Sequence, residues 1–166
     1  MAVDDDIAKV AEQERQLVFP RFDEDTAFAI GSALRQAAAD KGKALAIDIR
    51  TWDRPLFYFA MAGTLPDNAE WVRRKSNTVR RYNRASYAMT LRHQKRGSGF
   101  AHDDGVDEME IAAHGGSFPI RLAGFSGVLG SITVSGVPGR DDHGFVVAAI
   151  AQHLGLDAAA LALSAE

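Results

Sequence analysis

Hydrophobic positions recur every three or four residues at both ends of the chain, the spacing typical of amphipathic helices. A leading helix is predicted over Asp4–Val18, and Pro20 interrupts the pattern after it. A second helix is predicted from Asp23 to Gly42, because carboxylates favour the first turn of a helix and glycine favours its end. Near the other terminus, the same spacing predicts a helix over Asp141–Leu154, with Asp141 or Asp142 as its cap.

Four short apolar runs lie between these helices and predict strands. Ala44–Ile49 and Leu56–Met61 flank Asp53-Arg54-Pro55, which is typical of a turn, so the two runs predict an antiparallel hairpin. Phe118–Leu122 and Val128–Val134 are separated by a glycine-containing turn and predict a second pair of strands.

Two basic helices are predicted between the two hairpins. The second is expected to begin at a Ser86 cap and to end at Gly97. On the first basic helix, the arginines lie on the side opposite to an apolar arc. One cation, a lysine, falls within that arc among the hydrophobic residues. That arc contains Trp71, Val72, Lys75, Val79 and Tyr82.

The order of these elements is α-α-β-β-α-α-β-β-α, which favours an antiparallel sheet layered by helices, the α+β class. The chain of 166 residues has the length of a single domain, residues 1–166. Residues 1–15 are expected to be either a leading helix or a loose N-terminal arm.

Charge is distributed very unevenly along the chain. Residues 71–96 carry nine Lys or Arg and no Asp or Glu, although the net charge of the whole chain is −3. The loop Ala101–Glu110 then carries five carboxylates and no Lys or Arg. The basic segment is therefore expected to face an anionic small molecule, an acidic protein surface or another copy of the chain, and the acidic loop is its internal or intersubunit counter-charge.

Several function classes are disfavoured by composition. Nucleic acid is not an expected partner, because the aromatic residues of the basic helices fall on their apolar side and the pI is about 5.9. Without cysteine there is no disulfide or thiolate zinc site. No apolar run approaches the roughly 20 residues of a membrane span, and the acidic N-terminus does not resemble a signal peptide. We therefore expect a cytoplasmic protein.

Two histidines are candidates for binding. His114 lies in the turn Ala112-Ala-His-Gly-Gly116, where Gly115 and Gly116 allow the backbone to approach a ligand closely. The alternative is a turn whose glycines supply positive φ and whose histidine caps a carbonyl. His143 leans toward the apolar face of the last predicted helix, which also fits a hydrogen-bonded histidine of the core or of an interface.

No catalytic set stands out from the sequence. There is no HExxH motif, no GxSxG motif and no phosphate-binding glycine loop. The chain is therefore interpreted as leaning toward a non-enzymatic function, with an enzyme for a small anionic metabolite left open.

Several longer motifs resemble one family, an uncharacterised bacterial and fungal family of the haem-degrading-domain superfamily. The resemblance extends over Gln16–Leu154. It rests on Asn68–Val79, Ser86-Tyr87, Ala112–Ile120, Ile132–Pro138 and Asp142-His143, with Asp48-Ile-Arg50 and Arg54–Tyr58 in agreement.

The resemblance implies a profilin-like fold, with a central antiparallel sheet flanked by helices, and assembly into dimers or larger rings. It also implies a first hypothesis for function, the binding of haem or a related anionic tetrapyrrole. His114 or His143 would then be the axial ligand of the iron, with no other metal ligand. Pairing with the propionates would fall to Arg73, Arg74 and Arg80.

The second hypothesis is a non-enzymatic, oligomeric protein-binding or assembly factor without a cofactor. In it, the basic helices would meet the acidic loop or the acidic N-terminus of another subunit.

Overall fold

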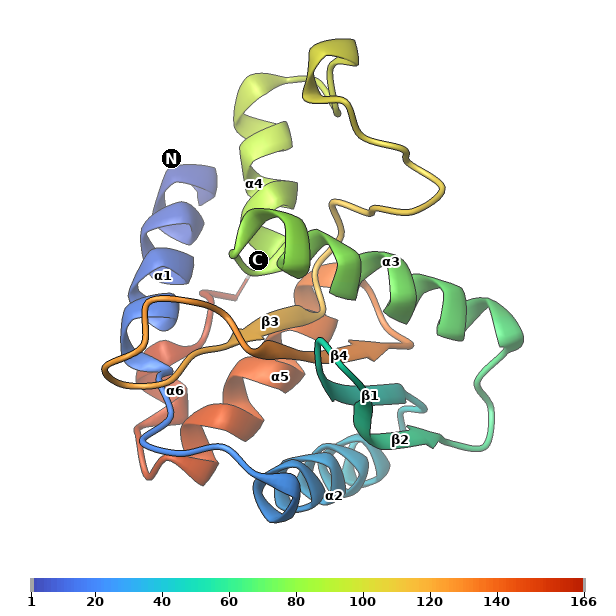
Figure 1. Ribbon diagram of the computed structural model, residues 1–166, viewed down its shortest axis with the longest axis vertical. Helices are drawn as coiled ribbons and strands as arrows, with labels where there is room; N and C mark the ends of the chain where they lie inside the picture. Colours follow the sequence, from blue (N-terminus) through green and yellow to red (C-terminus); the bar gives the residue numbers. More distant parts are fainter. Residues whose placement is uncertain (1, 166) are drawn as a thin grey trace.

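A four-stranded antiparallel sheet forms the centre of the computed structural model, which describes residues 2–165 (Figure 1). The order across the sheet is β2-β1-β4-β3, so β1 and β4 are the inner strands. The bounds are β1 Ala46–Thr51, β2 Pro55–Ala60, β3 Ser117–Ile120 and β4 Gly130–Ser135. Residue pairs such as Ile47 with Phe59 and Ile47 with Val134 fix the register of β1 against both of its neighbours.

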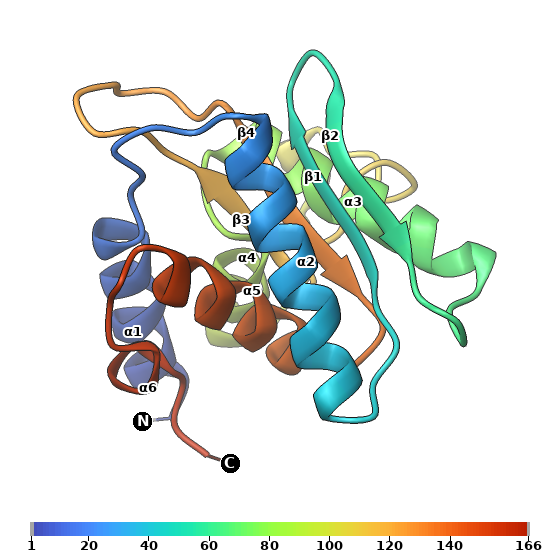
Figure 2. The ribbon, with the colours of Figure 1, turned by 90° about the horizontal axis from the view of Figure 1, so that it is seen from below.

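Helices cover the sheet on both faces. One face packs against α2 and α5, and α3 crosses the opposite face over β3 and β4 (Figures 1 and 2). Helix α1 lies against α4 beyond the sheet, and the two described ends of the chain lie close to each other (Figure 2). The helices are α1 Ala2–Gln16, α2 Glu24–Asp40, α3 Pro66–Tyr82, α4 Ser86–Arg96, α5 Gly139–His153 and α6 Ala158–Leu161, with a 3₁₀ turn at His102–Asp104.

The main core fills the space between the sheet and helices α2 and α5. Ile30 and Leu34 of α2 and Ile150 of α5 are at most 1% exposed. From the sheet, Ile47 and Ile132 contribute fully buried side chains. Burying a side chain of this size stabilises a fold by roughly 1.5–3 kcal/mol, so this layer holds the sheet and the two helices together.

The α+β class and the order of the main elements are confirmed, with bounds that differ by a few residues from the predicted ones. The predicted caps are wrong at two helices. Ala85, not Ser86, precedes α4, and the Ser86 hydroxyl is buried and accepts a hydrogen bond from the backbone N–H of Ser117 at 3.0 Å. Helix α5 begins at Gly139 without a side-chain cap, because the Asp142 side chain turns toward α3.

No helix within residues 2–165 is long and apolar enough to cross a membrane.

The short helix α6 was not expected from the sequence. Its four residues are too few to show a periodic pattern. Asp157 caps the helix by accepting hydrogen bonds from the N–H groups of Ala159 and Ala160.

Candidate functional site

Internal contacts neutralise much of the basic segment. Arg73 pairs with Glu110 at 2.6 Å, and Arg74 donates to the carbonyl of Glu108 at 2.6 Å. From α1, Glu14 pairs with Arg84 and Asp4 pairs with Lys95, both at 2.7 Å. Within a single chain, the acidic loop and the acidic first helix thus supply counter-charge to helices α3 and α4.

His143 lies in the core. Its side chain is fully buried, and its Nε2 lies 2.8 Å from Gln13 Oε1. Gln13 donates its own amide to the carbonyl of Leu161, so its oxygen is the acceptor and His143 Nε2 is the donor. His143 Nδ1 has no hydrogen-bond partner within residues 2–165. In this conformation a ligand reaches neither nitrogen unless the core opens.

The charge state of His143 follows from this burial. Desolvation lowers its pKa to about 3, and the positive charge of Arg140 acts in the same direction while Asp6 opposes it. His143 is therefore neutral at physiological pH, which is consistent with a position inside the fold.

His114 occupies a different environment, at a cavity of about 330 Å³ lined by the first half of α3, the end of β4 and the start of α5. The His114 side chain is exposed, and its ring packs edge-on against Trp71 with 4.8 Å between ring centroids. The guanidinium of Arg74 lies 4.7 Å from the centroid of the same indole. The imidazole and the indole therefore both line this cavity, and the guanidinium lies over the indole beside it.

Partial desolvation lowers the pKa of His114, and the nearby charges of Lys75 and Arg74 lower it further. A neutral imidazole has a lone pair available for a metal ion or a hydrogen bond. Neither ring nitrogen of His114 has a hydrogen bond within the described part of the chain, so the predicted capping of a carbonyl is not observed.

A buried ion pair forms the floor of the same cavity. Lys75 Nζ lies 2.8 Å from Asp142 Oδ2 and donates to the carbonyl of Val134 at 3.2 Å. The other carboxylate oxygen of Asp142 accepts the backbone N–H of Val137. Burial lowers the pKa of Lys75 and raises that of Asp142, and the attraction between the two ions limits both shifts.

Gly115 and Gly116 pack the turn against the rest of the chain. A Cβ on Gly115 would lie 2.1 Å from the Gly139 carbonyl oxygen. Gly116 has φ +128°, and a Cβ there would lie 2.6 Å from the Val134 carbonyl oxygen. Glycine is thus required here for close approach to the backbone of α5 and β4, and the ion pair is brought next to His114 as a result.

Arg73 and Arg80 line a second cavity, of about 430 Å³, on the other side of α3. Arg80 lies over the indole of Trp52 at 5.7 Å, and the buried Asp48 binds Arg50 through two hydrogen bonds of 2.7 and 2.8 Å. The predicted site residues are therefore not brought together in one place. His114 lines one cavity, with Arg74 over the indole of Trp71 beside it. Arg73 and Arg80 line another cavity, and His143 is in the core.

Two features of the His114 cavity were not identified in the sequence. Trp71 was assigned to the core but is only half-buried and contacts His114. The pairing of Lys75 with Asp142 joins residues 67 positions apart, and no local signal shows it. Residues 2–165 contain no cluster of three His, Cys, Asp or Glu side chains that could hold a metal ion, so a metal centre here would have one protein ligand and obtain the others from a cofactor.

Comparison with known proteins gives a consistent result. The model of the family "Haem degrading protein HbpS-like" matches residues 22–151. A "UPF0303 protein" of Burkholderia cenocepacia is 50% identical over 164 residues, which is 99% of each chain.

Two solved structures share the fold. The crystal structure of the Ybr137w protein has a TM-score of 0.80 and 25% identity, and the match covers 90% of this chain and 87% of that one. The crystal structure of a PduOC:heme complex has a TM-score of 0.63 and 16% identity, over 75% of this chain and 89% of that one. At 16% identity, the second likeness is one of fold.

Proposed function

Because the chain belongs to the HbpS-like family of haem-degrading proteins, we propose that it binds haem or a related anionic tetrapyrrole, with His114 as the single protein ligand of the iron. One structural neighbour is a haem complex according to its name. Bound haem would supply an iron centre capable of redox chemistry. The residues of this chain would hold the macrocycle and pair with its acidic groups.

The observation that carries this proposal is the position of His114. It is the candidate histidine with an exposed, neutral ring at a cavity, whereas His143 is enclosed by the core. Trp71 beside it offers a flat apolar surface to a macrocycle, and Arg74 offers a cation to a propionate. The cavity of about 330 Å³ is at the lower limit for small-molecule sites, so it would hold one edge of the macrocycle and leave the remainder over the surface.

A haemin titration followed by absorbance tests the proposal. We expect a saturable Soret shift with one haemin per chain in the wild type, and loss of that shift in His114→Ala. His102→Ala is the matched control, because His102 is fully exposed and lies in the acidic loop. Arg74→Gln should weaken haemin binding by roughly three- to tenfold, since a charge-assisted bond to a propionate is removed. A shift of the same size in His114→Ala, or no shift in the wild type, would overturn the proposal.

We propose self-association without a cofactor as the second candidate, and strand β2 is the feature that favours it. This strand pairs with β1 on one side only and contains no charged residue. Tyr58 and Phe59 are 51% and 39% exposed, and Phe28 of α2, next to the strand, is 66% exposed. An uncharged edge strand with exposed aromatic side chains is a favourable surface for pairing with another strand.

Light scattering after size exclusion, at low and high salt, tests this candidate. An oligomer that dissociates in Tyr58→Lys but persists in Phe125→Lys would support it, because Phe125 is equally exposed but lies in a loop. A wild-type protein that is monomeric at both salt concentrations would contradict it.

A further inference from the structure

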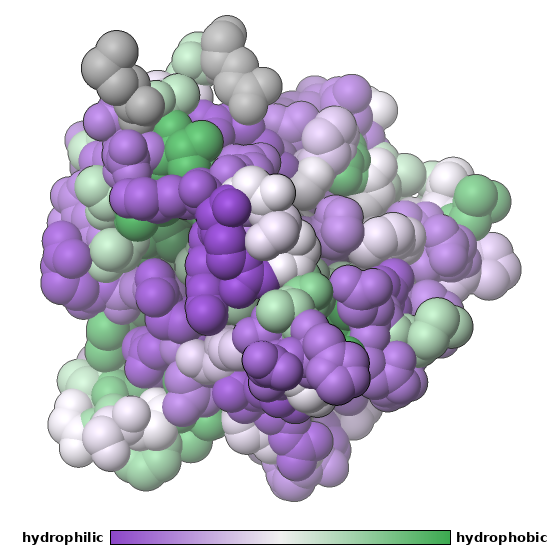
Figure 3. All heavy atoms as spheres, turned by 90° about the horizontal axis from the view of Figure 1, so that it is seen from above, coloured by the Kyte–Doolittle hydropathy of each residue, from purple (hydrophilic) through white to green (hydrophobic). Residues whose placement is uncertain are grey.

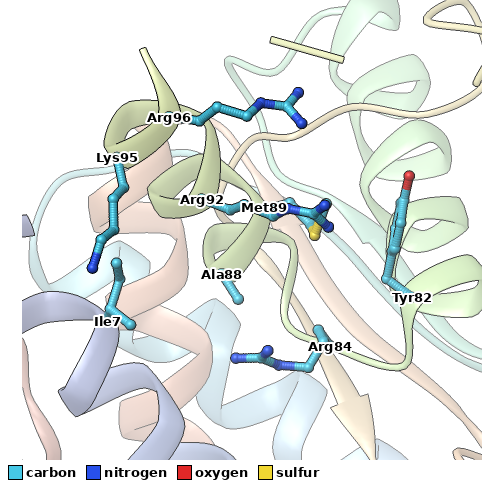
Figure 4. A pocket seen from close by; sticks show the side chains of 8 residues that line it. All are labelled: Ile7, Tyr82, Arg84, Ala88, Met89, Arg92, Lys95 and Arg96. Atoms are coloured by element: carbon cyan, nitrogen blue, oxygen red, sulfur yellow. The ribbon is translucent and has the colours of Figure 1, made fainter. Parts of the chain in front are cut away.

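A separate groove of about 680 Å³ lies along α4, beside α1 and the end of α3 (Figure 4). It shares no lining residue with the His114 cavity. Figure 3 shows this end of the molecule covered mainly by hydrophilic residues, with small hydrophobic areas between them. The groove combines these two kinds of surface.

Within the described part of the chain, residues 2–165, the polar lining of the groove is basic apart from one tyrosine. Its cations are Arg84, Arg92, Lys95 and Arg96, and no carboxylate of those residues lines it. Three of the four pair with acidic residues that do not line the groove: Arg84 with Glu14, Lys95 with Asp4, and Arg96 with Asp104. Each pairing leaves other N–H donors of the cation available.

Arg92 differs from the other three cations. It is exposed, and it has no hydrogen bond or ion pair within residues 2–165. Both Arg92 and Met89 line the groove, and in Figure 4 their side chains overlap. A cation in this position can bind an anion without first breaking an internal pair, so Arg92 is the residue on which an acidic group would be held.

The remaining lining is apolar. Ile7 of α1 and Ala88 of α4 are half-buried, and Met89 is 5% exposed. Met89 and Arg92 lie three positions apart on α4, which puts the apolar surface directly beside the cation. An inorganic anion would use only the charged half of such a groove.

We propose that this groove binds an anionic amphiphile, a molecule in which a carboxylate or phosphate is joined to an apolar body the size of a medium acyl chain. The acidic group contacts Arg92 with support from its neighbouring cations, and the apolar body covers Ile7, Ala88 and Met89. The volume of the groove lies within the range of small-molecule sites. The ligand needs no iron and no histidine, so this proposal is independent of haem binding at His114.

Isothermal titration calorimetry with decanoate tests the proposal, with butyrate and decanol as comparison ligands. Decanoate should bind at least about tenfold more tightly than butyrate, because its additional methylenes are buried against Ile7, Ala88 and Met89. It should also bind at least about tenfold more tightly than decanol, which has the chain but lacks the charge. Equal binding of butyrate and decanoate, or of decanol and decanoate, would overturn the proposal, and so would absence of decanoate binding.

Two charge reversals locate the site. Arg92→Glu should weaken decanoate binding by about tenfold or more, since it replaces the anion's partner with a like charge. Arg21→Glu is the matched control, an exposed arginine outside the groove, and should leave the affinity within about twofold. Equal effects of the two reversals would show that decanoate responds only to net charge and would overturn the assignment to this groove.

The same variants distinguish an acidic protein segment as the occupant. A wild-type oligomer that dissociates in Arg92→Glu and does not bind decanoate would assign the groove to a neighbouring copy and overturn the small-molecule proposal. The haemin titration with Arg92→Glu should match the wild type, so failure of either ligand leaves the other assignment intact.

Discussion

Lys75 and Lys95 belong to the same basic segment and form ion pairs of nearly the same length, 2.8 and 2.7 Å, yet they lie in opposite environments. The side chains of Lys75 and Asp142 are 4% and 1% exposed. Those of Lys95 and Asp4 are 63% and 60% exposed. Distance alone therefore does not distinguish the two pairs, and burial decides what each contributes.

A buried pair is costly to form and more costly to break. Both ions lose their hydration, and their mutual attraction together with further hydrogen bonds offsets that loss. Removal of one partner leaves the other charged in a medium that solvates it poorly. At the surface, water and salt replace a missing partner at little cost. We expect the largest mutational effects in the buried polar groups and the smallest in the exposed basic surface.

The largest effect is expected for Lys75→Met. It leaves the Asp142 carboxylate buried without a cation, and breaking a buried pair in this way costs about 3–5 kcal/mol of unfolding free energy. Denaturant unfolding at pH 7 measures the loss. The cause is the unpaired charge, since Met retains most of the volume of the lysine chain.

The double variant Lys75→Met with Asp142→Asn separates charge from packing. Asn keeps an oxygen that can accept the N–H of Val137 but carries no charge. It should recover at least about half of the lost free energy. If the double variant is as unstable as Lys75→Met, the pair contributes through packing and the comparison between the two lysines fails.

A second, smaller effect concerns the pH dependence given by His143. Its pKa is about 3 in the folded protein and about 6.5 in an unfolded chain. Between these values the unfolded state binds the additional proton, so His143 makes the folded state less stable as the pH falls below about 6.5. Its contribution is independent of pH above that value, where the ring is neutral in both states.

His143→Leu removes the imidazole that takes up this proton in the unfolded state. From pH 7.5 to pH 5, the unfolding free energy of the wild type should fall by about 2 kcal/mol relative to that of the variant. The steepest part of this change is about 1.4 kcal/mol per pH unit. Unfolding curves at several pH values measure it. Loss of the Gln13 hydrogen bond should lower the variant's stability equally at all pH values. A difference that does not change with pH would mean that His143 titrates normally in the folded state.

Periodicity was sufficient for the fold but only partly for the site. The pattern gave the order of the main elements because alternation and helical spacing report which face of each element is buried. It also put Lys75 in the apolar arc of α3, where the structure confirms it as buried. The partner of Lys75 could not be found in this way, because Asp142 and Lys75 meet only once α5 and α3 have both packed against β4.

The two candidate histidines show the same limit. The apolar lean of His143 correctly indicated a core position as one of two interpretations. The glycines beside His114 were compatible with both a ligand site and a tight turn. The structure shows that they are required for close backbone packing, and that the contact of His114 is Trp71. The environment of each histidine depends on packing between residues far apart in the sequence, which local sequence patterns do not predict.

The smallest effect is expected for the exposed pair. Lys95→Ala removes an ion pair whose two side chains are mostly in water, so the melting temperature should fall by less than about 2 °C. The change should become smaller still in 0.5 M salt, because screening already weakens the pair in the wild type. Differential scanning calorimetry at low and high salt measures both values.

Asp4→Asn removes the other partner of the same pair, so it should change the melting temperature by a similar amount. A loss in either variant as large as that of Lys75→Met would show that the contact of α1 with α4 depends on this pair, and burial would then not be the property that separates the two lysines.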